Sequence, residues 1–213
     1  MNRDLDLPPR VWAIVPAAGR SRRMGVNKLF LPWGGSTVLG TLLSTLGGGG
    51  LSGVFVVGRA DDDELANAVA KAGAEFVPAA VDPPDMRTSI EIGLRRVALE
   101  QPNGSDAWLT VPADHPLGDP ATVQTLCAAW AEHGTGIVMP EWNGRRGHPT
   151  LFAWPLAAEV AEIPADSGLN WLVRKHAQNL HVVETSDPSV LADLDRPDDY
   201  KTWRNRLGAE APG

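Results

Sequence analysis

Short apolar runs alternate with longer amphipathic stretches along most of this chain. Apolar runs bounded by turn residues are typical of buried β-strands, whereas apolar residues at helical spacing favour amphipathic helices. The predicted strands cover residues 11–15, 54–57, 75–78, 107–111, 136–140, 150–153 and 180–184. The predicted helices cover residues 37–46, 61–72, 87–99 and 119–132. Because strands alternate with helices, the pattern predicts βαβ units and a largely parallel sheet.

The alternation loosens after the fourth predicted helix. Residues 150–153 and 154–163 favour an inserted strand and helix over another regular βαβ unit, and Pro197 is suited to begin a helix over 196–207. We expect the glycine run at 47–50 to be a flexible connector. The predicted fold class is therefore α/β, with a three-layer, Rossmann-like, mostly parallel sheet and a small inserted β/α element.

Length and composition are those of a globular protein. The 213 residues suffice for one domain, which we expect over residues 11–207, between a disordered lead-in (residues 1–10) and a flexible tail (residues 208–213). The formal net charge of −7 argues against nucleic-acid binding. No apolar stretch is long enough for a membrane span or a signal peptide. With Cys127 as the one cysteine, we expect a cytoplasmic location.

The segment between the first predicted strand and Lys28 carries the strongest chemical signal. Residues 16–28 read PAAGRSRRMGVNK. Gly19 and Gly25 permit close backbone approach to a ligand, and the amides and cations of the loop would bind a polyphosphate. The loop lacks both the Gly-Lys-Ser/Thr of the Walker pattern and the G-x-G-x-x-G dinucleotide fingerprint. It is thus a phosphate-binding candidate of another type, with a solvated basic turn as the alternative.

Acidic side chains follow the fourth predicted strand and precede the last predicted helix. Asp114 lies just beyond that strand, and Asp193 and Asp195 flank Leu194. Turn formation or helix capping would explain each of them separately. Open α/β sheets bind ligands outside the carboxyl ends of their strands, so we expect the loops after the first, fourth and fifth predicted strands at one edge. Mg²⁺ favours such hard oxygen ligands, usually one or two carboxylates.

The loop from Pro16 to Lys28 resembles the signature loop of the MobA-like nucleotidyltransferases, and more narrowly that of the molybdenum cofactor cytidylyltransferases. The resemblance implies a nucleotide-diphospho-sugar-transferase-like fold and a nucleotidyltransferase domain over 11–207. The pair Ala18-Gly19 matches the Ala-Gly of the cytidylyltransferases, where guanylyltransferases have Gly-Gly, and so favours CTP. The implied nucleotide contacts are Ala17, Ala18, Gly19, Arg20, Ser21, Met24, Gly25, Lys28 and Ser89.

The same resemblance implies a metal site and catalytic groups. Asp114 matches the family's Asp-x-Pro element and Asp195 its C-terminal Asp-x-Asp-x-Pro element, so these two are the implied Mg²⁺ ligands, with Asp193 less favoured. Lys28 and Arg20 would stabilise the α-phosphate and the departing pyrophosphate. Nucleotidyl transfer needs alignment and cations more than covalent help from the protein. The implied catalytic residues are therefore Lys28, Arg20 and Asp114.

Two further segments concern the acceptor. The sequence RGHP, beginning at Arg146, resembles a family element and implies acceptor contacts from Arg146, Gly147 and His148. A lone histidine is often structural instead. Residues 82–94 resemble a different family segment, which borders the base and ribose, and Asp85 stands there where the family commonly has glycine. In the second acceptor segment, Asn170 stands where the cytidylyltransferases tend to have arginine. The loss of that arginine weakens the inference of a pterin phosphate as acceptor.

The function implied by the resemblance is Mg²⁺-dependent transfer of CMP from CTP to a phosphorylated acceptor, first a molybdopterin-type cofactor, with release of pyrophosphate. Guanylyl transfer and transfer to another small phosphorylated metabolite stay open. So does a non-transferase role, as an oxidoreductase or as a partner that delivers cofactor to a molybdoenzyme. Of these roles, nucleotidyl transfer is the one that needs paired metal carboxylates.

Overall fold

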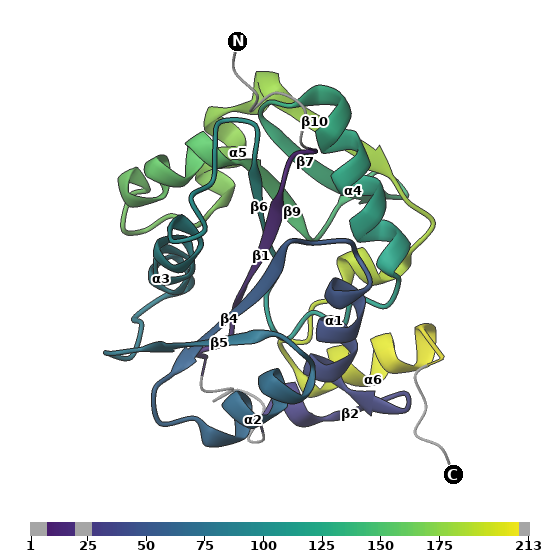
Figure 1. The fold of residues 1–213 in the computed structure, drawn as a ribbon. Helices are drawn as coiled ribbons and strands as arrows, with labels where there is room; N and C mark the ends of the chain where they lie inside the picture. Colours follow the sequence, from purple (N-terminus) through teal and green to yellow (C-terminus); the bar gives the residue numbers. More distant parts are fainter. Residues whose placement is uncertain (1–7, 20–26, 209–213) are drawn as a thin grey trace.

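A mostly parallel β-sheet forms the centre of the fold (Figure 1). The computed structural model describes residues 8–19 and 27–208. The strands of the described structure are β1 (Val11–Pro16), β2 (Pro32–Trp33), β3 (Ser36–Thr37), β4 (Gly53–Arg59), β5 (Glu75–Ala79), β6 (Ala107–Thr110), β7 (Ile137–Trp142), β8 (Arg145–Arg146), β9 (Thr150–Ala153) and β10 (Leu180–Glu184). Of these, β2 and β3 pair with each other in a separate two-stranded sheet. Its α-helices are α1 (Val38–Gly47), α2 (Asp63–Lys71), α3 (Met86–Ala98), α4 (Pro120–His133), α5 (Asn170–Lys175) and α6 (Pro197–Arg206). The 3₁₀ segments are η2 (Lys28–Phe30), η3 (Trp154–Glu162), η4 (Ala177–Asn179) and η5 (Pro188–Leu191).

The strands lie across the sheet in the order β10-β7-β9-β6-β1-β4-β5, with β8 paired to β7. β1 runs parallel to both of its neighbours, β4 and β6, and β10 runs parallel to β7. β9 is antiparallel to β6 and β7, because the chain returns into the sheet directly from the β7–β8 hairpin. The predicted fold class, a mostly parallel sheet with an inserted strand, is confirmed.

The regular elements lie where the hydrophobic pattern predicts them. Each predicted strand and each predicted α-helix is present within two residues of its expected ends. The predicted helix over 154–163 is instead the 3₁₀ segment η3. The pattern missed β2, β3, β8 and α5, which are too short for a repeating signal to emerge. Within the glycine run expected to be a flexible connector, Gly49 is buried against Val123 of α4, whereas the other three glycines are exposed.

Helices cover both faces of the sheet, with α3 on one face and α1 and α4 on the other (Figure 1). β1 is buried along its whole length. The helix α3 approaches it closely at Gly93, where a Cβ would collide with the side chain of Ile14. Full burial of one such aliphatic side chain stabilises a fold by about 1.5–3 kcal/mol. The buried central strand β1 therefore fixes the position at which the following loop begins.

The chain reverses its direction across the sheet next to β1. It passes from β1 to β4 and β5 on one side, and α3 then carries it back to β6 on the other side. The connections that leave the carboxyl ends of β1 and β6 therefore diverge. Ligands of open α/β sheets bind at such a point.

A smaller hydrophobic core lies apart from the main one. Trp33, Val38 and Leu194 are buried in it, and Tyr200 of α6 packs against them. The Tyr200 hydroxyl donates a hydrogen bond of 2.5 Å to the carbonyl of Pro32. Figure 1 shows α6 beside β2 and α1, although these elements come from opposite ends of the chain. Segments from both ends are thus held together next to the sheet.

The described residues include part of the predicted lead-in. Residues 1–7, and residues 209–213 of the predicted tail, lie outside them. Arg10, the last residue of the lead-in, donates a hydrogen bond of 2.8 Å to the buried carboxylate of Asp106. Over residues 8–19 and 27–208, no helix has the length and apolar character that crossing a bilayer requires.

Candidate functional site

A pocket of about 650 Å³ opens at the carboxyl end of β1, where the chain changes direction across the sheet. Its walls come from the loops after β1 and β6, from the loop between β5 and α3, and from two residues distant in sequence, Lys28 and Asp195. Small-molecule sites typically enclose about 300–1,000 Å³. The lining residues are Pro16, Ala17, Ala18, Gly19, Lys28, Leu29, Asp82, Pro83, Pro84, Asp85, Met86, Ser89, Pro112, Ala113, Asp114 and Asp195.

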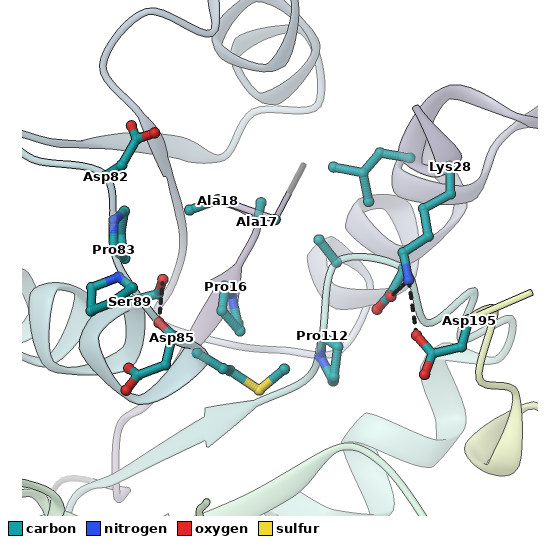
Figure 2. A pocket seen from close by; sticks show the side chains of 16 residues that line it. Pro16, Ala17, Ala18, Lys28, Asp82, Pro83, Asp85, Ser89, Pro112 and Asp195 are labelled. Atoms are coloured by element: carbon teal, nitrogen blue, oxygen red, sulfur yellow. Dashed lines mark hydrogen bonds and ion pairs between the residues drawn. The ribbon is translucent and has the colours of Figure 1, made fainter. Parts of the chain in front are cut away.

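One end of the pocket carries Lys28 and two carboxylates. The Lys28 ammonium forms an ion pair with Asp114 and lies 3.3 Å from Oδ1 of Asp195. It also donates a hydrogen bond of 3.3 Å to the carbonyl of Leu194. Figure 2 shows the side chains of Lys28 and Asp195 pointing toward each other. The three charged residues singled out in distant parts of the sequence therefore meet in one place.

Local structure explains why Asp114 and Lys28 face this space. Asp114 lies in a tight turn after β6, which a hydrogen bond of 3.1 Å from the N–H of His115 to the carbonyl of Pro112 closes. Lys28 begins η2, whose N-terminus is capped by the side chain of Asn27. Both residues thus lie within short, hydrogen-bonded turns, where the backbone limits their movement.

The segment with the two C-terminal aspartates is anchored by the residue between them. Leu194 is fully buried in the smaller core, while Asp193 and Asp195 are exposed. One carboxylate oxygen from each of Asp114, Asp193 and Asp195 lies within 4.8 Å of the others. Asp193, the less favoured candidate in the sequence, therefore belongs to the same acidic cluster.

The acidic cluster shifts the protonation of its members. Burial by itself would lower the pKa of Lys28, but the neighbouring Asp114 and Asp195 carboxylates raise it above its ordinary value. Partial burial and the charges of Asp195 and Asp114 raise the pKa of Asp193, and Lys28 only partly opposes them. At neutral pH Lys28 is therefore charged, and Asp193 carries its charge against unfavourable neighbours.

We expect Asp193→Asn to stabilise the metal-free protein. Because the folded-state pKa of Asp193 is raised, its contribution to stability is fully present below the unfolded pKa and is lost as pH rises through the folded value. At neutral pH, removing the charge should raise the unfolding midpoint by about 1–2 °C, as expected for about 0.5 kcal/mol at an exposed site. Thermal unfolding of both proteins at pH 7 and pH 4 checks this, since the difference should shrink at pH 4.

The cluster suits a hard divalent cation. Carboxylate oxygens are the ligands that Mg²⁺ and Mn²⁺ prefer, and three of them converge here. A positive charge, the Lys28 ammonium, already bridges Asp114 and Asp195. The carboxylate oxygens and the negative charge of the cluster therefore both suit a metal ion held by these aspartates. The other coordination positions of that ion would be left for phosphate and water.

The opposite end of the pocket is also polar. Figure 2 shows Asp82, Pro83, Asp85 and Ser89 across the pocket from Lys28. Asp85 caps α3, because its carboxylate accepts a hydrogen bond of 2.7 Å from the N–H of Thr88. This backbone hydrogen bond lowers the pKa of Asp85, although burial opposes the shift. Two carboxylates thus stand at the end of the pocket farthest from the ammonium.

In addition to Lys28, four of the predicted nucleotide contacts line the pocket, namely Ala17, Ala18, Gly19 and Ser89. The N–H of Ala17 donates a hydrogen bond of 2.8 Å to the carbonyl of Val57, and the Arg59 guanidinium donates one of 3.4 Å to the carbonyl of Ala18. The start of the loop is thus fastened to β4. The other predicted contacts, Arg20, Ser21, Met24 and Gly25, lie outside the described residues.

The predicted acceptor contacts are not among the pocket-lining residues. Arg146 is exposed on β8. At Gly147 a Cβ would collide with the carbonyl of Val190, so the close approach of two backbones already accounts for this glycine. The ring of His148 lies behind the turn of Asp114, 5.3 Å from the ring of His115 between centroids. An acceptor role for these three residues stays a prediction.

Several pocket residues were not named as individual contacts, although the resemblance implies that their segment borders the base and ribose. Asp82, Pro83, Pro84 and Met86 line the pocket along with Asp85. The signal was a proline-rich loop that leads into a helix directly after a predicted strand. By the strand-end rule, such a loop belongs at the same edge as the loops after β1 and β6.

Comparisons with known proteins show which family and which solved structures this chain resembles. The family model for the MobA-like NTP transferase domain matches residues 13–180. The chain is 27% identical to the molybdenum cofactor cytidylyltransferase of Escherichia coli K12, over 91% of this chain and 95% of that protein. It is 26% identical to the molybdenum cofactor guanylyltransferase of Rhizobium rhizogenes, over 90% of both chains. Among solved structures, Rv0371c from Mycobacterium tuberculosis superposes with a TM-score of 0.76 at 25% identity, covering 92% of this chain and 98% of that one.

Proposed function

Because the chain belongs to the MobA-like NTP transferase family, we propose that it transfers CMP from CTP to a phosphorylated small-molecule acceptor of the molybdopterin type, with Mg²⁺ as its metal. The observation that carries the proposal is the convergence of Lys28, Asp114 and Asp195 at one end of the pocket. The relative from E. coli, a molybdenum cofactor cytidylyltransferase, supports the choice of nucleotide and acceptor.

Residues at different places along the pocket have different roles in the proposed reaction. Lys28 supplies a fixed positive charge against the triphosphate, and the loop that begins at Ala17 brings backbone amides close to it. Asp114 and Asp195, with Asp193 beside them, would hold the divalent ion, which neutralises charge on the phosphates when bound. A phosphate acceptor is already anionic at neutral pH and so needs no general base. The protein would accelerate the reaction by aligning the acceptor phosphate with the nucleotide and by neutralising the charge on the phosphates.

Guanylyl transfer is the second candidate, and the far end of the pocket favours it. Asp82 and Asp85 can only accept hydrogen bonds when ionised. Guanine presents donors at N1 and N2, whereas cytosine presents one amino group beside two acceptors that a carboxylate would repel. Against this, Ala18 matches the cytidylyltransferases. The relative from R. rhizogenes is a guanylyltransferase.

A panel of nucleoside triphosphates with Mg²⁺ tests the proposal. At a ligand concentration of about 100 times the Kd, the bound nucleotide should stabilise the fold by about 2.7 kcal/mol. For a chain of this length that is a rise of about 5–10 °C in the unfolding midpoint. The proposal expects this shift with CTP and none with ATP or UTP.

The outcomes separate the candidates. A shift with GTP alone would replace cytidylyl by guanylyl transfer. No shift with any nucleotide, together with no pyrophosphate release in the presence of molybdopterin, would reject a nucleotidyltransferase and leave the non-transferase roles. A shift with CTP but pyrophosphate release only with another phosphorylated metabolite would correct the acceptor and keep the reaction.

A further inference from the structure

The turn that carries Asp114 contains a buried histidine that does not line the nucleotide pocket. His115 is only 3% exposed. Its Nε2 nitrogen has no hydrogen-bond partner among the described residues. Burying a polar ring with an unpaired nitrogen is unfavourable, and an apolar side chain of similar size would avoid that cost. The reason for an imidazole at this position must therefore lie in the contacts that the rest of the ring makes.

Those contacts lead to the segment that precedes the C-terminal aspartates. Burial lowers the pKa of the His115 ring well below its ordinary value, and the backbone of Ser189 beside the ring partly opposes this shift. On its other side it packs edge-on against the ring of His148, whose Nδ1 is also unpaired within the described part of the chain. His148 in turn donates its backbone N–H to the carbonyl of Val190 at 2.8 Å. Both histidines are therefore attached to η5.

Ser189 is bound to the Asp114 turn a second time. Its hydroxyl oxygen accepts a hydrogen bond of 3.0 Å from the N–H of Gly118. Its own N–H donates to the carboxylate of Asp187 at 2.8 Å, which fixes the direction of the segment. The segment from residue 112 to 118 is thus joined to η5 at two points, through the ring of His115 in its middle and the backbone N–H of Gly118 at its end.

This joint connects the two halves of the acidic cluster. Asp114 is the neighbour of His115, and Asp193 and Asp195 follow Ser189 by a few residues. Lys28 also links these carboxylates, through its ion pairs with Asp114 and Asp195. The flanking packing units differ, because Ala113 and Val190 are buried in the main core and Leu194 is buried in the smaller core. Metal affinity depends on the separation of ligand oxygens to within a fraction of an ångström, so a connection between the units has a direct effect on it.

We propose that His115 is a positioning residue, whose ring ties the Asp114 turn to η5 and thereby sets the spacing of Asp114 and Asp195 for a divalent cation. The proposal rests on the proposed function in one respect, that this cluster is the metal site. His115 touches neither the ion nor the nucleotide. Its effect is on the affinity of the cluster for the metal.

The test compares two substitutions at His115 by their effect on binding of Mn²⁺ alone, without nucleotide. His115→Leu keeps an apolar side chain of similar size but removes the polar ring beside Ser189 and His148, and His115→Gln keeps a side-chain donor at this position. Loss of a residue that orients metal ligands typically reduces metal affinity about 10–100-fold. We expect the Kd for Mn²⁺, measured by electron paramagnetic resonance of the free ion, to rise about tenfold in His115→Leu and to stay within about threefold of the original in His115→Gln.

Thr45→Val is the matched control. The buried Thr45 hydroxyl donates to the carbonyl of Leu117 at 2.8 Å and so fastens the same turn, but to α1 and not to η5. We expect a lower unfolding midpoint and an unchanged Kd for Mn²⁺. If His115→Leu binds Mn²⁺ as tightly as the original chain, or if Thr45→Val weakens binding equally, the positioning role is wrong. If the original chain itself does not bind Mn²⁺, or binds it equally well after Asp114→Ala, it is the proposed metal site that fails.

Discussion

Replacing either Asp114 or Asp195 with alanine is expected to reduce pyrophosphate release by about a thousandfold or more, because metal stabilisation of the transferring phosphate supplies several kcal/mol and each 1.36 kcal/mol is a factor of ten. The two residues come from different parts of the chain, yet both lie against Lys28. Each loss should therefore be of similar size. Initial rates at saturating CTP, acceptor and Mg²⁺ measure it.

The charge of these residues can be separated from their size. Asp114→Asn and Asp195→Asn keep the shape of the side chain and remove the charge, and they should lose nearly as much activity as the alanine variants. Asp198→Ala is the matched control: Asp198 is almost fully exposed at the start of α6, and among the described residues it pairs with Lys201 alone, at 3.7 Å. Its rate should stay within about twofold of the original, since exposed ion pairs contribute little.

A different pattern would overturn the assignment. If Asp195→Ala keeps its rate while Asp193→Ala loses it, the roles of the two C-terminal aspartates are exchanged. Near-normal rates for both Asp114 and Asp195 variants would remove the metal site from the reaction. Thermal unfolding of every variant guards against misreading a loss of folded protein as a loss of chemistry.

Much of this site could be predicted because it follows from topology. The apolar run of β1 and the run that ends before Asp114 have the composition of neighbouring buried parallel strands. Parallel strands place their carboxyl ends at one edge, so the loops after them converge. Asp195 needed the family resemblance as well, because no periodic pattern connects a segment before the last helix with that edge.

The features that could not be predicted depend on three-dimensional approach. Gly147 looks like a substrate-loop glycine in the sequence, and only the adjacent carbonyl of Val190 reveals a packing reason for it. His115 looks like an incidental neighbour of Asp114 until its burial and its contact with η5 are known. In both cases the partner is the chain near residue 190, which folds back behind the Asp114 turn through contacts that leave no local pattern.

Lys28→Met is expected to lower the rate of pyrophosphate release by about a hundredfold to a thousandfold, the range found when one preorganised stabiliser of transition-state charge is removed. Methionine keeps the apolar length of the side chain and lacks the ammonium. The same change should destabilise the metal-free protein, because Asp114 and Asp195 lose the cation between them. At about 1–2 kcal/mol for a partly buried pair, the unfolding midpoint should fall by about 3–8 °C.

The pH dependence of that destabilisation follows from the direction of the shift. Since the pKa of Lys28 is raised in the folded protein, its stabilising contribution is fully present below the unfolded pKa and is lost as pH rises through the folded value. The difference in midpoint between the original chain and Lys28→Met should therefore persist through neutral pH and narrow in strongly alkaline solution. It should also narrow in acid, where the carboxylates become protonated.

Metal binding distinguishes Lys28 from the aspartates most sharply. In the nucleotide-free protein the ammonium and a divalent ion compete for the same two carboxylates, so Lys28→Met should bind Mn²⁺ at least as tightly as the original chain, whereas Asp114→Ala should bind it far less tightly. Lys28→Arg keeps the charge and should retain the original stability with a reduced rate, because the planar guanidinium cannot reproduce the compact contact of the ammonium. Weaker Mn²⁺ binding in Lys28→Met would mean that Lys28 holds the aspartates in place. It would then act by organising the metal site, and the charge it offers the triphosphate would be secondary.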